Sequence, residues 1–276
     1  MTRLSASGEL GLLRELERRA LIVGVEHDAA RIGDDLVVTQ DALVEGVHFR
    51  FDWISWRELG FRAAAVNLSD LAASGAAPEA LLVTLAAPAS TLTADVIALY
   101  EGIAEAGVPV VGGDTTSASE VVISVTAIGR SDRVPGRAGA QPGDLLVVTG
   151  ALGAAGAAFR TGGYARPPLR LAEGRALAET AHALLDISDG LAVDAGHVAA
   201  RSNVRCVFEL DRVPLAVGAT IDDLGFGEDF ELLAAVPDAH GLTVIGRVEA
   251  GDGVELLFHG EPHPLRGWEH FAQPAT

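Results

Sequence analysis

A stretch of small residues that also carries polar side chains, residues 66–76, constrains the fold of this chain more than any other feature. Its apolar spacing predicts a tightly packed helix, yet Asn67, Ser69 and Asp70 stand where such a helix would carry Leu or Ala. A buried carboxylate is costly unless a cation or a hydrogen-bond donor satisfies it. We therefore expect the rest of the chain to bring partners to Asp70.

Further acids occur in comparable settings. Residues 186–191 again place a serine and two aspartates beside an apolar helix, and two more aspartates follow strand-like runs. The carboxyl ends of strands line the crevice where open α/β sheets bind ligands, and sites made only of oxygen ligands suit Mg²⁺ better than zinc. A single Asp in such a setting is more often the cap of a turn or a helix than a metal ligand. Together they favour a cation site: Asp28, Asp41, Asp70, Asp114, Asp186 and Asp189.

Strand-like and helical patterns alternate in both halves of the chain, which predicts an α/β protein with mixed sheets. The best boundary is the segment 129–143, which is rich in glycine, proline and arginine. We therefore expect two domains, residues 1–136 and residues 137–276. Gly150, Gly153 and Gly156 follow a strand, but their spacing is wrong for a dinucleotide fingerprint and predicts close helix packing instead.

The composition excludes several classes of function. The formal charge is −18, and all 20 basic residues are arginines, so a P-loop lysine and a pyridoxal Schiff base are both excluded. Such an acidic chain is a poor nucleic-acid binder. No apolar run reaches the roughly 18 residues needed to span a membrane, and we expect no membrane partner. Cys206 is the only cysteine, which agrees with a reducing compartment, and we expect a cytoplasmic protein.

Seven motifs, in order along the chain, resemble those of the thiamine-monophosphate kinase family, which belongs to the aminoimidazole ribonucleotide synthetase-like superfamily. The resemblance runs from residue 8 to the tail at residues 268–271 and so covers nearly the whole chain. The motifs are residues 8–12, 41–49, 65–72, 112–116, 139–144, 186–191 and 227–232.

This resemblance implies a two-domain fold, shared with selenophosphate synthetase and the hydrogenase-maturation dehydratase. The N-terminal domain would bind metal and ATP, and it would dimerise, with strands of both subunits of a homodimer building a central β-barrel. The implied reaction transfers the γ-phosphoryl group of ATP to thiamine monophosphate and makes thiamine diphosphate with the help of several Mg²⁺ ions. The acceptor phosphate is already ionised at neutral pH, so we expect direct transfer with no catalytic acid, base or nucleophile from the protein.

The family pattern also implies roles for individual residues. The Mg²⁺ ligands would be Asp28, Thr39, Gln40, Asp41, Asp70, Asp114, Asp186 and Asp189. The ATP contacts would be Gly113, Asp114, Arg137 and Ser188. The thiamine phosphate contacts would be His48, Glu228 and Trp268.

Three positions depart from the family pattern. His27 replaces one acid of a Gly-Asp-Asp motif, Gln40 stands where Ser or Thr is usual, and Phe226 replaces the first glycine before residues 227–229. An altered metal affinity would follow from the first. Two alternatives stay open: a dimeric nucleotide-binding paralogue without turnover, and another ATP-dependent enzyme of the superfamily. Cys206 does not lie near either terminus, where two of those enzymes need a reactive cysteine.

Overall fold

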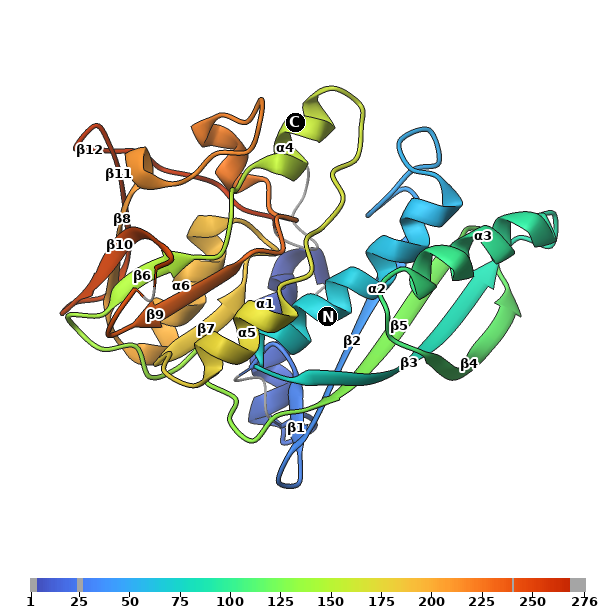
Figure 1. Cartoon of the computed structure of the whole chain (residues 1–276), viewed down its shortest axis with the longest axis horizontal. Coiled ribbons are helices and arrows are strands. Elements are labelled where there is room, and N and C mark those ends of the chain that lie inside the picture. The colour runs from blue at the N-terminus through green and yellow to red at the C-terminus, as the bar shows by residue number, and fades with distance from the viewer. Residues whose placement is uncertain (1–3, 24–26, 240, 269–276) are drawn as a thin grey trace.

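The computed structural model describes residues 4–23, 27–239 and 241–268, and its strands form two separate sheets (Figure 1). The first sheet belongs to the N-terminal half of the chain. Every neighbouring pair in it is antiparallel except β3–β4, which is parallel. In spatial order its strands are β1 (Ala30–Ile32), β2 (Leu36–Val44), β5 (Val122–Arg130), β3 (Ala77–Ala87) and β4 (Val110–Ser117).

The second sheet is built by the C-terminal half and is also mixed, because β8 and β11 run parallel while the other pairs are antiparallel. These two mixed sheets confirm the α/β class that the sequence predicts. The proposed division at residues 136 and 137 stays a prediction. In spatial order the strands are β12 (Glu261–Pro262), β11 (Gly253–Phe258), β8 (Arg205–Glu209), β10 (Thr243–Glu249), β6 (Leu145–Val148), β9 (Leu232–Val236) and β7 (Ala183–Asp186).

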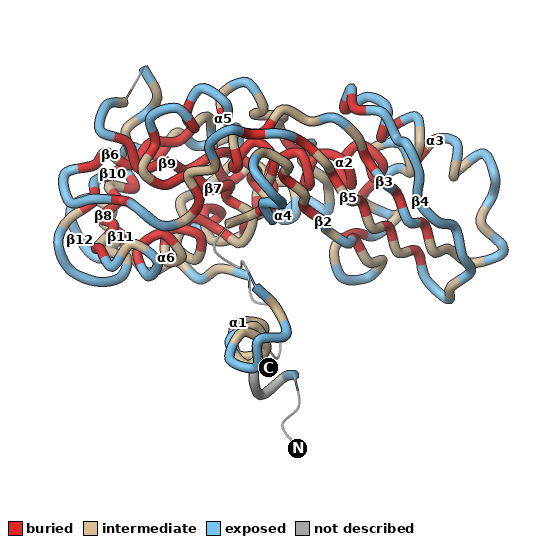
Figure 2. Tube along the Cα trace, turned by 90° about the horizontal axis from the view of Figure 1, so that it is seen from below, coloured by how far each residue is buried: buried red, intermediate tan, exposed pale blue. Residues whose placement is uncertain are grey.

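The helices cover these sheets and connect their strands. Figure 2 shows α1 as a projection from the body of the molecule, whereas the residues buried in the body are concentrated in and between the two sheets. None of the described helices has the length and apolar character that crossing a membrane requires. The helices are α1 (Leu4–Arg18), α2 (Trp56–Ala73), α3 (Thr93–Ala104), α4 (Ala154–Arg160), α5 (Leu171–Ala178) and α6 (Leu191–Ser202), with 3₁₀ turns η1 (Leu210–Arg212) and η2 (Ile221–Gly225).

Helix α2 is the central element of the molecule. Ser55 caps its N-terminus by accepting a hydrogen bond from the Glu58 N–H group, which satisfies one of the free N–H groups of the first turn. Nearly all of its residues from Leu59 onward are buried, because one part packs on the first sheet and α3 while its end packs on α5 and the second sheet. Small residues allow this burial on all sides, since they let several elements approach one helix at once.

Two glycines set the contact between α2 and α3. A Cβ atom on Gly60 would lie 1.9 Å from the Leu99 carbonyl oxygen, and one on Gly102 would lie 1.8 Å from the Arg57 carbonyl oxygen. The backbones of the two helices therefore touch at positions where no other residue fits.

The first sheet corrects two expectations about where its acids lie. Asp41 and Asp114 were expected just beyond the ends of strands, but β2 continues to Val44 and β4 continues to Ser117, so both acids lie inside strands. Alternation along β2 then decides the face of each residue: Thr39 and Asp41 point to the side that α2 covers, and Gln40 points to the opposite side.

We expect Gly60→Ala to destabilise the protein by about 1–3 kcal/mol or more, because the added methyl group forces α2 and α3 apart. Gly196→Ala is the matched control: it lies inside α6, a Cβ atom there would meet no other atom within 4 Å, and helix propensity favours alanine by roughly 0.5–1 kcal/mol. Denaturant unfolding of both variants measures the difference. Similar unfolding midpoints would contradict the close helix contact.

Candidate active site

A cavity of about 610 Å³ lies between the two halves of the chain. Its walls include β2 and α2 from the N-terminal half, and the loops that follow β7 and η2 from the C-terminal half. All of the predicted site residues except Gly113 and Asp114 line it, which places residues far apart in sequence around one space. Those residues are Asp28, Thr39, Gln40, Asp41, His48, Asp70, Arg137, Asp186, Ser188, Asp189, Glu228 and Trp268.

Five aspartates reach the cavity from five different segments. Asp28 precedes β1, Asp41 projects from β2, Asp70 lies near the end of α2, Asp186 ends β7, and Asp189 lies in the turn before α6. The first sheet, the central helix and the second sheet each contribute at least one carboxylate. The cluster thus exists only when the two halves pack together.

The polar residues of α2 hold this cluster in place. The Thr39 hydroxyl donates to Asp70 Oδ2 at 2.5 Å, and the Ser69 hydroxyl donates to Asp186 Oδ2 at 2.6 Å. Asn67 accepts the backbone N–H of Asp41 through its Oδ1 at 3.0 Å. Asn67, Ser69 and Asp70 therefore join α2 to strands of both sheets, which explains why this helix carries them.

The cluster is electrostatically costly without a cation. Burial raises the pKa of Asp186 to about 7, and the neighbouring Asp28 carboxylate adds to the shift. Burial likewise raises the pKa of Asp70 well above its ordinary value, with repulsion from Asp41 and Asp186 adding to it, and it raises the pKa of Asp41. A multivalent cation that binds among such carboxylates stabilises their ionised forms and relieves their mutual repulsion.

Arg137 supplies part of the missing positive charge. Its Nε and Nη2 atoms both donate to Oδ1 of Asp28, at 2.8 and 2.6 Å. The Asp28 side chain is 3% exposed, so this pair is largely shielded from water. Burial nonetheless raises the pKa of Asp28, so one guanidinium does not compensate the whole cluster.

The donor set fits a hard divalent cation such as Mg²⁺. The groups that converge are carboxylates and a hydroxyl, and Mg²⁺ prefers oxygen ligands of this kind. The uncompensated negative charge of the cluster also favours a divalent cation, because such an ion would neutralise it.

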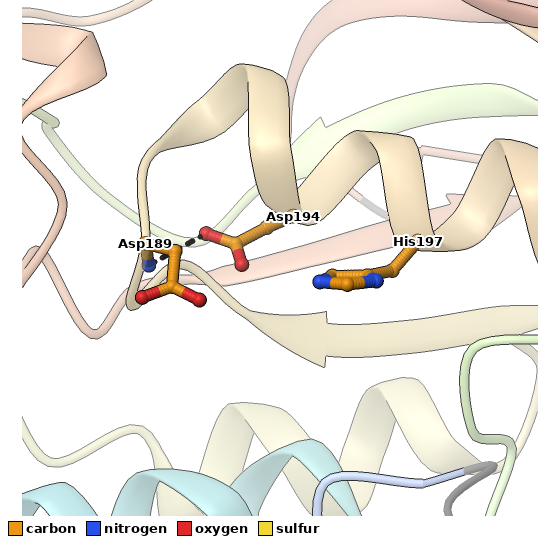
Figure 3. Close-up of side chains that lie close together, drawn as sticks. All are labelled: Asp189, Asp194 and His197. Carbon is orange, nitrogen blue, oxygen red and sulfur yellow. Dashed lines mark hydrogen bonds between the residues drawn. The ribbon is translucent and has the colours of Figure 1, made fainter. Parts of the chain in front are cut away.

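A smaller acidic group extends from Asp189 along α6 (Figure 3). Asp189, Asp194 and His197 each place a potential ligand atom within 4.8 Å of the others. The Asp189 N–H group donates to Asp194 Oδ2 at 3.0 Å, which fixes the turn that carries Asp189. Burial lowers the pKa of His197 to about 4, with Arg137 and Arg201 adding to the effect, so the imidazole is neutral at pH 7. This group supports the site already described.

The residues assigned to thiamine phosphate line the same cavity. His48 accepts the Val44 N–H through Nδ1 at 3.0 Å, which sets the orientation of its ring. Glu228 has a positive φ of 58° and forms an ion pair with Arg62. Trp268 is half exposed, and its backbone N–H group donates to the Asp189 carbonyl oxygen at 2.9 Å.

Arg62 is a site residue that the sequence did not indicate. Its side chain is 5% exposed, lines the cavity, donates to the His48 carbonyl oxygen at 2.7 Å and pairs with Glu228. It therefore links α2 to a loop of the C-terminal half. Its partners lie 14 and 166 residues away, so no local sequence pattern could reveal it.

Gly113 and Asp114 lie elsewhere in this chain. Following the register across the first sheet, Asp41 pairs with Val125, Val125 with Val83, and Val83 with Gly113. Three strand spacings separate Asp41 from β4 by about 14 Å. Asp114 itself alternates onto the face that α2 does not cover. Gln40 does line the cavity, although its side chain points to that same face and its amide donates to the Ser124 hydroxyl at 3.0 Å.

The departures from the family pattern have distinct surroundings. His27 does not line the cavity; its Nδ1 is buried, has no hydrogen-bond partner among the described residues, and packs so closely on Gly136 that a Cβ there would lie 1.9 Å away. Phe226 does line the cavity.

Comparisons with known proteins find relatives that match nearly the whole chain. Residues 26–131 match the family described as AIR synthase related protein, N-terminal domain. The thiamine-monophosphate kinase of Pyrococcus horikoshii is 34% identical over 98% of this chain and 97% of its own. The structure of AaThiL complexed with AMPPCP and TMP superposes with a TM-score of 0.88 at 31% identity, over 98% of this chain and 99% of that one. Hydrogenase maturation protein HypE in complex with ATP shares the fold, with a TM-score of 0.70 at 20% identity over 98% of this chain and 99% of that one.

We expect Asp70→Asn to stabilise the metal-free protein by about 1–3 kcal/mol, because it removes one of several mutually repelling buried carboxylates. The same variant should lose most of the thermal stabilisation that Mg²⁺ gives to the unaltered protein. Thermal unfolding with EDTA and with Mg²⁺ measures both effects. Asp34→Asn, in the exposed turn between β1 and β2, is the control and should change neither. A metal-free Asp70→Asn protein that melts at a lower temperature would contradict the interpretation.

Proposed function

Since the chain belongs to the thiamine-monophosphate kinase family, we propose that it phosphorylates thiamine monophosphate with ATP and produces thiamine diphosphate and ADP. An oxygen of the acceptor phosphate forms a bond to the γ-phosphorus of ATP, and the bond from that phosphorus to the β,γ-bridging oxygen breaks. The likeness to AaThiL, whose structure holds AMPPCP and TMP, supports this choice of substrates.

One observation carries the proposal: a single cavity combines five aspartates with the residues assigned to the acceptor. Bringing two polyanions together is the main difficulty of this reaction. An acidic site that also lacks metal would repel both substrates, so the acids make chemical sense when cations accompany the phosphates.

The lining of the cavity supports direct transfer. It contains neither cysteine nor lysine, and its histidine Nδ1 already accepts a backbone hydrogen bond. The nucleophile is a phosphate oxygen that is ionised at neutral pH, so no strong base is required. Orientation of the two substrates is then the main contribution of the protein.

Mg²⁺ would be held by the aspartates of the cluster, with Thr39 as a neutral donor. When bound, it would neutralise and orient the phosphates. The assigned ligands are Asp28, Thr39, Gln40, Asp41, Asp70, Asp114, Asp186 and Asp189, of which Gln40 and Asp114 lie on the uncovered face of the first sheet.

We assign the ATP contacts to Gly113, Asp114, Arg137 and Ser188, and the acceptor contacts to His48, Glu228 and Trp268. Arg62 positions two of the acceptor contacts, because it binds the His48 carbonyl oxygen and the Glu228 carboxylate together. We place the reaction in the cytoplasm, where a buried thiol such as Cys206 remains reduced.

We further propose that two copies of the chain form the β-barrel of the family. All eight residues of β4 are exposed at one edge of the first sheet. At the other edge β1 covers only Leu36–Val38 of β2, and no described strand pairs with the outer edge of residues 39–44. Exposed strand edges of this kind invite pairing with another chain. Placing β4 of each copy beside residues 39–44 of the other would close both openings.

This arrangement would also give Asp114 a role. Within one chain, three strand spacings, or about 14 Å, separate Asp114 from the strand that carries Asp41. From a two-fold related copy, it would lie beside residues 39–44 and complete the metal and ATP site there.

We expect Asp41→Asn to lower kcat by at least about 10³-fold without lowering the unfolding temperature of the metal-free protein, because it removes a metal ligand and a repelling carboxylate but no packing contact. ADP release and mass detection of thiamine diphosphate measure turnover. Asp252→Asn, in the exposed turn before β11, is the control and should retain full activity. Turnover by Asp41→Asn within about tenfold of the unaltered protein would contradict the metal site. An unaltered protein that binds ATP but makes no thiamine diphosphate would instead favour the nucleotide-binding paralogue.

Mixing two inactive variants tests the shared site. Asp41→Ala and Asp114→Ala should each be inactive, but a 1:1 mixture allowed to exchange subunits should regain about a quarter of full activity, since half the dimers carry one intact site of two. Asp41→Ala mixed with Asp70→Ala is the control, because both residues lie in one chain's cavity and no intact site forms. No recovery in the first mixture, despite subunit exchange, would contradict the shared site.

A further inference from the structure

Three aromatic side chains form a continuous wall on one side of the cavity. Phe159, from the end of α4, lies with its ring centroid 4.9 Å from that of Phe226 and 5.4 Å from that of Trp53. All three residues line the cavity. They come from segments that carry none of the five aspartates, so the lining combines an aromatic group with the acidic one.

The wall is held rigidly. Gly156, one turn before Phe159, allows α4 to lie directly on the segment after η2: a Cβ on Gly156 would lie 3.0 Å from Phe226 Cβ. Next to the rings, Arg160 donates to both carboxylate oxygens of Asp223, at 2.9 and 2.6 Å, and to the Gly218 carbonyl oxygen at 2.9 Å. These contacts fix the backbone positions that carry Phe159 and Phe226.

Phe159 and Phe226 also line a second cavity, of about 530 Å³. Phe159 is 48% exposed and, with Phe226 and Trp53, it forms a group of apolar rings in the cavity lining. An exposed apolar surface of this kind inside a cavity favours a flat ligand that would cover it.

The chemical structure of the acceptor indicates which of its groups would contact the aromatic wall. In thiamine monophosphate the phosphate and the aminopyrimidine ring lie at opposite ends of a cationic thiazolium ring. The phosphate must reach the aspartates and their cations, so the aminopyrimidine lies away from them. The cavity lining carries seven carboxylates (Glu9, Asp28, Asp41, Asp70, Asp186, Asp189 and Glu228) against three guanidinium groups (Arg50, Arg62 and Arg137), which favours a cationic ring between the two ends.

We infer that Phe159 and Phe226, together with Trp53, bind the aminopyrimidine ring of thiamine monophosphate and close that end of the acceptor site. The inference rests on the proposed kinase function and makes these side chains determinants of acceptor specificity. Because the rings would contact only the acceptor, removing one should weaken acceptor binding and leave nucleotide binding unchanged.

Calorimetric binding tests this with two acceptors in the presence of Mg²⁺ and a non-hydrolysable ATP analogue. One is thiamine monophosphate, and the other is the same phosphorylated thiazolium with a methyl group in place of the pyrimidinylmethyl group. Phe159→Ala and Phe226→Ala should each weaken thiamine monophosphate about tenfold, the size of one lost aromatic contact, and leave the truncated acceptor unchanged. Phe258→Ala, an aromatic change in β11 outside the cavity, should alter neither affinity.

Three outcomes would overturn the inference. Equal weakening of both acceptors would show a general loss of structure, and unchanged affinity for both would show that the rings do not touch the ligand. Weaker binding of the ATP analogue alone would assign the wall to the nucleotide. If the variants give one of these results but the unaltered protein turns over thiamine monophosphate, only the inference about the rings is wrong and the proposed function still holds. Unaltered protein that neither binds nor turns it over overturns both.

Discussion

The structure depends on keeping several buried carboxylates close together. Burial and mutual repulsion raise the pKa of Asp70 and of Asp186, and Arg137 neutralises one acid of the group. Such a cluster opposes folding, and it persists because hydrogen bonds from Thr39 and Ser69 are built into the surrounding elements. The same repulsion gives the site its chemistry, since cations that relieve it would also attract phosphates.

Helix α2 carries part of the carboxylate cluster and also packs against most of the fold. Its small residues let α3, α5 and both sheets pack against it, and Asn67, Ser69 and Asp70 project from the same helix into the cluster. The packing that joins the two halves therefore also positions the acids. Arg62, on the same helix, extends this control to the acceptor part of the cavity through Glu228.

The polar residues of α2 and the motif from Asp186 to Asp189 were predictable, because polar side chains in an apolar helix need partners. The positions of Asp41 and Asp114 were not, since both strands continue through polar residues: alternate residues of β2 face opposite sides, and every residue of β4 is exposed in a single chain. Arg62 and the aromatic wall depend on contacts between distant segments, and local patterns carry no signal for these.

The most direct test of the central claim, that the acids unite two phosphates through cations, is the Mg²⁺ dependence of thiamine monophosphate binding. Calorimetry with the non-hydrolysable ATP analogue would be repeated over a range of Mg²⁺ concentrations and in EDTA. We expect the affinity for thiamine monophosphate to rise with Mg²⁺ and to be lost in EDTA, because the uncompensated aspartates repel the phosphate. Equally tight binding in EDTA would contradict it.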